Sequence, residues 1–111
     1  MTTYLQQIVE MCCKIHFRSI NPKKVKFHLT PKSWKFEGRR QLVGLWSIKR
    51  GIVTLQVDKE FAEDADEIVL TAKIAHELAH VKLKHPEKRT FENDMAAEEE
   101  VKKFFKKWIK K

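Results

Sequence analysis

The stretch that decides the fold runs from Ile68 to Lys84 and reads Ile-Val-Leu-Thr-Ala-Lys-Ile-Ala-His-Glu-Leu-Ala-His-Val-Lys-Leu-Lys. Drawn as a helix, it carries apolar residues around most of its circumference, which is typical of a buried helix. The exceptions recur at three- and four-residue spacing and share one stripe: Lys73, His76, Glu77, His80 and Lys84. Because buried ionisable groups are costly unless they are paired or bind a metal, this stripe predicts the wall of a cleft.

Within this stretch, His76-Glu77-Leu78-Ala79-His80 is an H-E-x-x-H segment. On a helix, two imidazoles four residues apart can bind one metal ion, and the intervening glutamate can reach a water on that metal. We therefore expect one zinc ion per chain, with His76 and His80 as ligands and Glu77 as the general base of a hydrolase. The His-x-x-Gly-x-x-His spacing of the metzincins is absent.

A catalytic zinc site needs a third protein ligand and keeps one position open. The last predicted helix runs from a Thr90 cap toward Lys111, and its apolar residues form one stripe: Val101, Phe104, Phe105, Trp108 and Ile109. Glu98 precedes Val101 by three residues and Phe105 by seven, which favours it as the ligand on the buried face. The helix phase is estimated, so Glu92, Asp94 and Glu100 stay as alternatives.

The remaining pattern predicts a single α+β domain over residues 1–111. A helix from Thr2 or Thr3 to about Phe17 comes first, followed by a short strand at 25–29. Strands at 42–48 and 52–57 flank a hairpin loop at 49–51, so we expect a small antiparallel three-stranded sheet before the H-E-x-x-H helix and the glutamate helix. An extended peptide substrate would pair with the sheet edge at Ile52, Val53, Thr54 and Leu55.

The segment from His76 to His85 resembles the H-E-L-x-H-x-x-x-x-H segment of the gluzincin metallopeptidases. Gluzincins carry their third ligand as the first Glu of an E-x-E-A-[DN]-x-F-like helix. Residues 98–104 match this pattern at both Glu positions and at Phe104, and depart from it at Val101 and Lys102. The resemblance covers residues 40–105 and implies that Glu98 is the ligand.

At this length the chain looks most like the minigluzincins, soluble relatives of the catalytic domains of membrane CAAX-prenyl and HtpX-type proteases and of BlaR/MecR peptidases. The resemblance implies zinc-dependent endopeptidase activity on peptide or protein substrates. The oxyanion donor stays open among four residues: His85, His28, Tyr4 and Lys73. For His85, a hydrogen-bonded position at the helix end is the competing role.

Composition indicates which cellular location and which partners we expect. The chain contains no apolar run long enough to span a membrane and no secretory signal pattern. The adjacent Cys12 and Cys13 cannot form an ordinary disulfide with each other, which favours a cytoplasmic location. The net charge of +8 is compatible with acidic partners, but basic residues are spread along the chain and no DNA-reading motif is visible, so nucleic acid is not expected as an obligatory partner.

The basic C-terminal segment carries Phe104, Phe105 and Trp108 between lysines. These rings predict a terminal helix that docks on the core, and they could instead occupy the protein's own cleft or that of a second copy, which would give latency or self-association. Two other functions stay open: a non-catalytic zinc-binding or interaction domain, and a DNA-associated metalloprotease or regulator of the SprT-like or ImmA-like kind.

Overall fold

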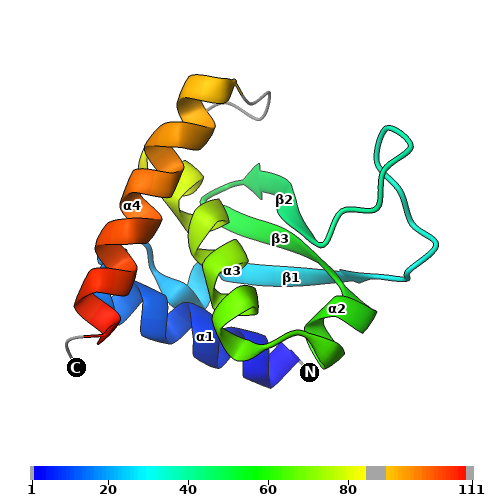
Figure 1. The fold of residues 1–111 in the computed structure, drawn as a ribbon, viewed down its shortest axis with the longest axis horizontal. Helices are drawn as coiled ribbons and strands as arrows, with labels where there is room; N and C mark the ends of the chain where they lie inside the picture. Colours follow the sequence, from blue (N-terminus) through cyan, green and yellow to red (C-terminus); the bar gives the residue numbers. More distant parts are fainter. Residues whose placement is uncertain (1, 85–89, 110–111) are drawn as a thin grey trace.

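Three long helices lie together on one side of a three-stranded sheet in the computed structural model, which describes residues 2–84 and 90–109 (Figure 1). The elements follow in the order α1 (Thr2–Ile15), a 3-10 turn η1 (Pro22–Lys24), β1 (Val25–Thr30), β2 (Val43–Lys49), β3 (Ile52–Asp58), α2 (Lys59–Asp64), α3 (Glu67–Lys82) and α4 (Phe91–Ile109). The predicted α+β architecture is confirmed, and α2 is an element that the sequence pattern did not predict.

The sheet is mixed rather than antiparallel, with the strand order β1-β3-β2. The turn at Arg50 and Gly51, both at positive φ, makes β2 and β3 an antiparallel hairpin. Before that hairpin, residues 31–42 carry the chain to the far side of the sheet, so β3 returns between the other two strands and runs parallel to β1. Alternation of polar and apolar residues reports which face a side chain occupies and not which strand lies beside it, so the antiparallel prediction was wrong for β1.

The core forms where α1, α3 and the inner face of the sheet meet. The largest side chains that are fully buried there include Leu5, Phe17, Leu55, Leu70 and Leu78. Cys12 and Cys13 are free thiols buried in this core, and burial raises the pKa of both, that of Cys13 to about 11. A thiol with a raised pKa is protonated and inert at neutral pH.

Side-chain caps fix where the helices begin. Asp58 Oδ1 accepts a hydrogen bond from the backbone N–H of Phe61 at 2.9 Å and starts α2 directly after β3. Asp66 accepts from the N–H of Ile68 at 2.8 Å at the start of α3. The predicted Thr90 cap of α4 is confirmed, because its Oγ1 accepts from the N–H of Asn93 at 3.1 Å.

The aromatic stripe of α4 belongs to the core in this structure. Phe104 is fully buried, with ring centroids 6.1 Å from Phe17 and 5.7 Å from Trp108, and Phe105 and Trp108 are partly buried against the same cluster. The docked-helix prediction for this segment therefore matches the structure. None of the helices within the described ranges has the length and apolar character required to cross a membrane.

Candidate metal centre

The two histidines of the H-E-x-x-H segment lie one turn apart on α3 and point toward the same place. Their Nε2 atoms are 3.1 Å from each other, and their rings meet edge to face with centroids 4.7 Å apart. His80 is buried, whereas His76 is partly exposed. This convergence is what the four-residue spacing predicts for a helix.

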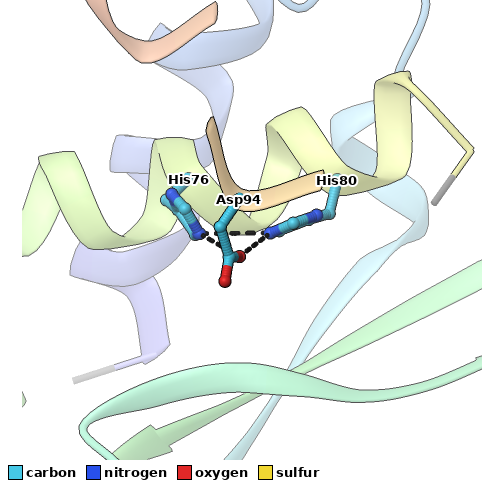
Figure 2. A group of neighbouring side chains, drawn as sticks. All are labelled: His76, His80 and Asp94. Carbon is cyan, nitrogen blue, oxygen red and sulfur yellow. Dashed lines mark hydrogen bonds and ion pairs between the residues drawn. The ribbon is translucent and has the colours of Figure 1, made fainter. Parts of the chain in front are cut away.

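Asp94, from the first turns of α4, completes a triangle with the two imidazoles (Figure 2). Its Oδ1 lies 3.3 Å from Nε2 of His76 and 3.0 Å from Nε2 of His80. Ligands about 2.0–2.1 Å from a tetrahedral zinc ion are about 3.3 Å from one another, so the three edges of this triangle fit a single small ion. His76, His80 and Asp94 could therefore hold a metal ion.

Glu98, the predicted third ligand, lies beside this triangle and not in it. Its Oε1 is 2.7 Å from Nδ1 of His76, the ring nitrogen on the other side from Asp94. An ionised carboxylate can only accept a hydrogen bond, so with a metal ion on Nε2 the proton of His76 would lie on Nδ1, toward Glu98. A carboxylate partner on the second nitrogen is the usual arrangement around a metal-binding histidine.

The phase of α4 explains why the sequence pattern favours Glu98 over Asp94. The buried residues of this helix are Ala97, Glu100, Val101 and Phe104, so the buried line runs one residue away from Glu98, whose side chain is 57% exposed. Glu100, one of the alternative ligands, is buried. Asp94 was among the alternatives. The sequence feature that could have indicated it is its position one helical turn before Glu98.

Glu77 lies in the wall of a cleft that opens beside the triangle. The cleft has a volume of about 530 Å³ and is lined by Val43, Ile68, Val69, Ala72, Lys73, His76, Glu77, Glu98 and Val101. Glu77 is only 3% exposed although it carries a carboxylate. Ile68 and Val69 are exposed on this wall, so α3 is not buried all round: its first turns present apolar side chains to the cleft.

A buried ionic junction holds α4 in position against α3 and α1. Glu100 on α4 contacts Lys82 at the end of α3, accepts from Lys103 at 3.2 Å, and lies 3.3 Å from Nε2 of His16. Lys82 first, with Lys103 and His16, lowers the pKa of Glu100 to about 2 against the opposing effect of burial. Because Lys82 follows His80 by two residues, this junction fixes the register between the two helices that carry the metal-binding triangle.

The predicted substrate edge at Ile52, Val53, Thr54 and Leu55 is wrong, because these residues belong to β3, which pairs with β1 on one side and β2 on the other. Their backbone groups are already used by the sheet. Among the described strands β2 is the edge nearest the cleft, since Val43 at its start lines the cleft wall.

The candidates for the oxyanion donor separate in space. Lys73 lines the cleft, whereas the His28 ring lies against Trp46 on the sheet, 4.2 Å between centroids. Tyr4 lies on α1, where burial and the nearby Glu67 and Asp66 raise its pKa. His85, predicted as an oxyanion donor or a helix-end residue, lies outside the described residues.

The fold and the site together define a small α+β domain with a two-histidine, one-aspartate cluster able to hold a metal ion between two helices. Comparisons of the chain with protein-family models, with curated proteins and with solved structures found no match.

Proposed function

We propose that the chain is a zinc-dependent metallopeptidase that hydrolyses peptide bonds in extended segments of protein substrates. The observation that carries this proposal is the triangle of His76, His80 and Asp94, with the buried carboxylate of Glu77 in the wall of the adjoining cleft. Two imidazoles and one carboxylate form the ligand set of many zinc hydrolases. When bound there, zinc would lower the pKa of a coordinated water and polarise a carbonyl group.

The residues of the chain would divide the remaining work. Glu77 takes the proton of the attacking water and delivers it to the leaving amine. Glu98 holds the proton of His76 on Nδ1, which keeps Nε2 as the ligand atom. Glu77 on α3 and Glu98 on α4 both line the cleft that adjoins the triangle, which supports these two roles.

The substrate would bind as an added strand along the free edge of β2. Strand addition provides main-chain hydrogen bonds that do not depend on sequence. Selectivity would come from the apolar wall of Val43, Ile68 and Val69, which suits an aliphatic or aromatic side chain next to the cleaved bond. The buried, protonated thiols of Cys12 and Cys13 are compatible with activity in the cytoplasm.

The test is the isosteric substitution Glu77→Gln, with metal content and peptidase activity measured on the same sample. We expect one zinc per chain in both proteins and a loss of hydrolysis of at least about 100-fold in the variant, because a positioned general base contributes roughly 10²–10⁴-fold. Glu99→Gln is the matched control, since Glu99 is exposed on α4 and its one ion pair within residues 2–84 and 90–109 is with Lys102.

Two results would reject the peptidase. One is cleavage of a quenched-fluorescence peptide library by Glu77→Gln at the wild-type rate. The other is a zinc-loaded wild-type protein that cleaves no peptide, which would leave a non-catalytic zinc domain. Iron in the purified protein would overturn the choice of zinc, because two histidines and a carboxylate also form the ligand set of Fe(II) oxygenases.

A further inference from the structure

The net positive charge of the chain comes from one continuous region that lacks acids. Lysines and arginines are spread along the sequence, but Glu37 is the sole acidic residue between Glu10 and Asp58. Residues 23–50 contain nine Lys and Arg residues against that one acid, and the rest of the chain is neutral. The excess of +8 therefore lies on η1, β1, β2, the connection between the two strands and the turn that follows β2, and not on α3 and α4.

Four aromatic rings gather within this region and form a surface that we call the aromatic platform: His28, Trp34, Phe36 and Trp46. The ring of Trp46 lies 4.2 Å from that of His28 and 5.8 Å from that of Trp34, and Trp34 stacks on Phe36 at 6.5 Å with an interplanar angle of 20°. Trp46 is 46% exposed and Phe36 is 51% exposed. About half of each of these two residues is thus exposed to solvent.

The platform lies on the face of the sheet that the long helices leave uncovered. His28 alternates with Phe27 and Leu29, which pack against the core, so its side chain projects to the opposite face. Its ring meets Trp46 although β1 and β2 are not neighbours, so the two side chains reach toward each other across β3. The metal-binding triangle, on α3 and α4, is on the other side of the sheet.

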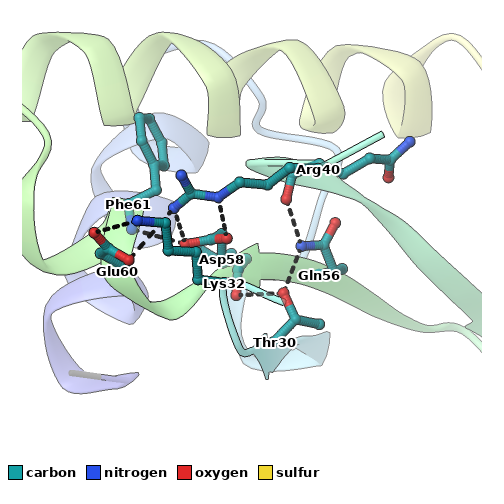
Figure 3. Close-up of polar contacts among 9 residues, drawn as sticks. Thr30, Lys32, Arg40, Gln56, Asp58, Glu60 and Phe61 are labelled. Atoms are coloured by element: carbon teal, nitrogen blue, oxygen red, sulfur yellow. Dashed lines mark hydrogen bonds and ion pairs between the residues drawn. The ribbon is translucent and has the colours of Figure 1, made fainter. Parts of the chain in front are cut away.

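The connection that carries Trp34 and Phe36 is tied to the sheet at its far end (Figure 3). Arg40 donates two hydrogen bonds of 2.8 Å to the buried Asp58, and Gln56 Nε2 donates to the carbonyl of Gln41 at 3.1 Å. At the tip, Phe36 and Arg39 pair across Glu37 and Gly38, both at positive φ. These contacts hold the rings in place before any ligand arrives, which lowers the entropy cost of binding.

Positive side chains that form no ion pair with a described acid lie on the same strands and connection as the rings. Lys32 and Arg40 are paired with acids of β3 and α2. In contrast, Lys26, Lys35, Arg39 and Lys49 are exposed, and no acid among residues 2–84 and 90–109 lies within ion-pair distance of them. Lys26 and Lys49 lie on the same face of the sheet as His28.

We infer that the aromatic platform and its lysine and arginine rim bind single-stranded nucleic acid, with bases stacked on the rings and phosphates contacting the cations. Exposed ring faces next to an electropositive track are the features by which proteins hold single strands without reading sequence. An anionic membrane is a poorer fit. Two of the four rings, His28 and Trp46, lie on strands of the sheet and not on the connecting loop, and Glu37 in the turn between Phe36 and Arg39 would meet anionic lipid head groups.

The experiment is a fluorescence-anisotropy titration of the full chain against labelled 20-nucleotide oligo-dT and oligo-U. We expect binding that weakens roughly 50-fold between about 50 and 200 mM KCl, if four cations each contribute about −0.7 to the salt slope. Trp46→Ala and Phe36→Ala should each weaken binding roughly 5- to 100-fold. Phe91→Ala, which removes an exposed ring on α4, is the matched control and should change nothing.

The charge contribution is tested with the double variant Lys26→Ala/Lys49→Ala. It should reduce the salt slope by about 1.4, whereas Lys14→Ala/Lys106→Ala, which removes the same charge from α1 and α4, should not. Circular dichroism of each variant checks that it is folded. His76→Ala should bind the oligonucleotide like wild type, so this inference does not depend on the proposed peptidase.

Several outcomes would overturn the inference. Failure to bind either oligonucleotide at the lower salt concentration is the simplest. Equal losses in Trp46→Ala, Phe36→Ala and Phe91→Ala would remove the role of the platform. Tight binding to phosphatidylserine vesicles with no oligonucleotide binding would assign the surface to a membrane instead.

Discussion

The assignment of Asp94 as a ligand and Glu98 as the partner of His76 can be tested by removing each in turn. In wild type, zinc at 100 times its Kd should stabilise the folded chain by about 2.7 kcal/mol. With an unfolding entropy of about 2.1 cal/mol/K per residue, a chain of 111 residues should then gain about 12 °C in Tm. Differential scanning fluorimetry, with and without zinc, measures this gain.

At the same zinc concentration, the gain in Tm should be reduced in Glu98→Gln and lost in Asp94→Ala. Loss of a hydrogen-bond partner of a metal ligand typically weakens metal binding 10- to 100-fold, so Glu98→Gln should retain a gain of about 2–6 °C. Asp94→Ala removes the negatively charged corner of the triangle, whose Oδ1 lies within 3.3 Å of both imidazole nitrogens, and should show no resolvable gain.

The reverse order would refute this reasoning. If Asp94→Ala kept a gain of about 12 °C and Glu98→Gln lost it, the third ligand would be Glu98, as the sequence pattern favoured. Competition with a chromogenic zinc chelator gives the same ranking as dissociation constants. Glu99→Gln, exposed on α4, is the control for the loss of one carboxylate and should match wild type.

Three further predictions concern the framework around the site. Glu100→Gln should lower the unfolding free energy at pH 7 by about 1–3 kcal/mol in urea titrations, because it removes charged hydrogen bonds to Lys82 and Lys103. The folded-state pKa of Glu100 is about 2 against an ordinary value of 4.5, so wild type should lose this contribution as the pH falls from 4.5 through 2. A difference between wild type and variant that is unchanged at pH 2 would contradict this account. Asp58→Ala should cost at least about 0.5–2 kcal/mol through the lost α2 cap alone, and Asp58→Asn, which keeps an acceptor, should cost less; equal losses would exclude the cap. Trp108→Ala should destabilise the chain by about 1–3 kcal/mol and leave peptidase activity per folded molecule unchanged, whereas raised activity would support blocking of the cleft by the C-terminal aromatics.

The sequence predicted those parts of the site that local geometry determines. The convergence of His76 and His80 follows from helix periodicity alone, because four residues always return a side chain to nearly the same face. Asp94 could not be distinguished from Glu98 in this way. The buried face of α4 includes the charged Glu100, whose burial depends on Lys82 and His16 from other helices, so the apolar pattern gave a phase that was off by one residue.

The sheet shows the same limit at a larger scale. The hairpin at Arg50 and Gly51 was predictable because its turn is local. The position of β3 between β1 and β2 depends on contacts across the whole sheet. The feature of β3 itself that reflects this central position is the burial of two polar residues near its end, Gln56 and Asp58. Buried polar groups need hydrogen-bond partners from other segments, here Thr30 for Nε2 of Gln56 and Arg40 for Asp58.

The position of the triangle across two helices has a consequence for how the chain could change over evolution. An ion shared by His80 and Asp94 closes a loop of 14 residues, and a cross-link over a loop of about that size restricts the unfolded chain by roughly 3 kcal/mol in the chain-entropy model. Glu77 takes no part in this cross-link. In a descendant that lost Glu77, selection for stability would still conserve both histidines and Asp94. The same three side chains would hold the two helices together through the ion, whether or not the site is catalytic.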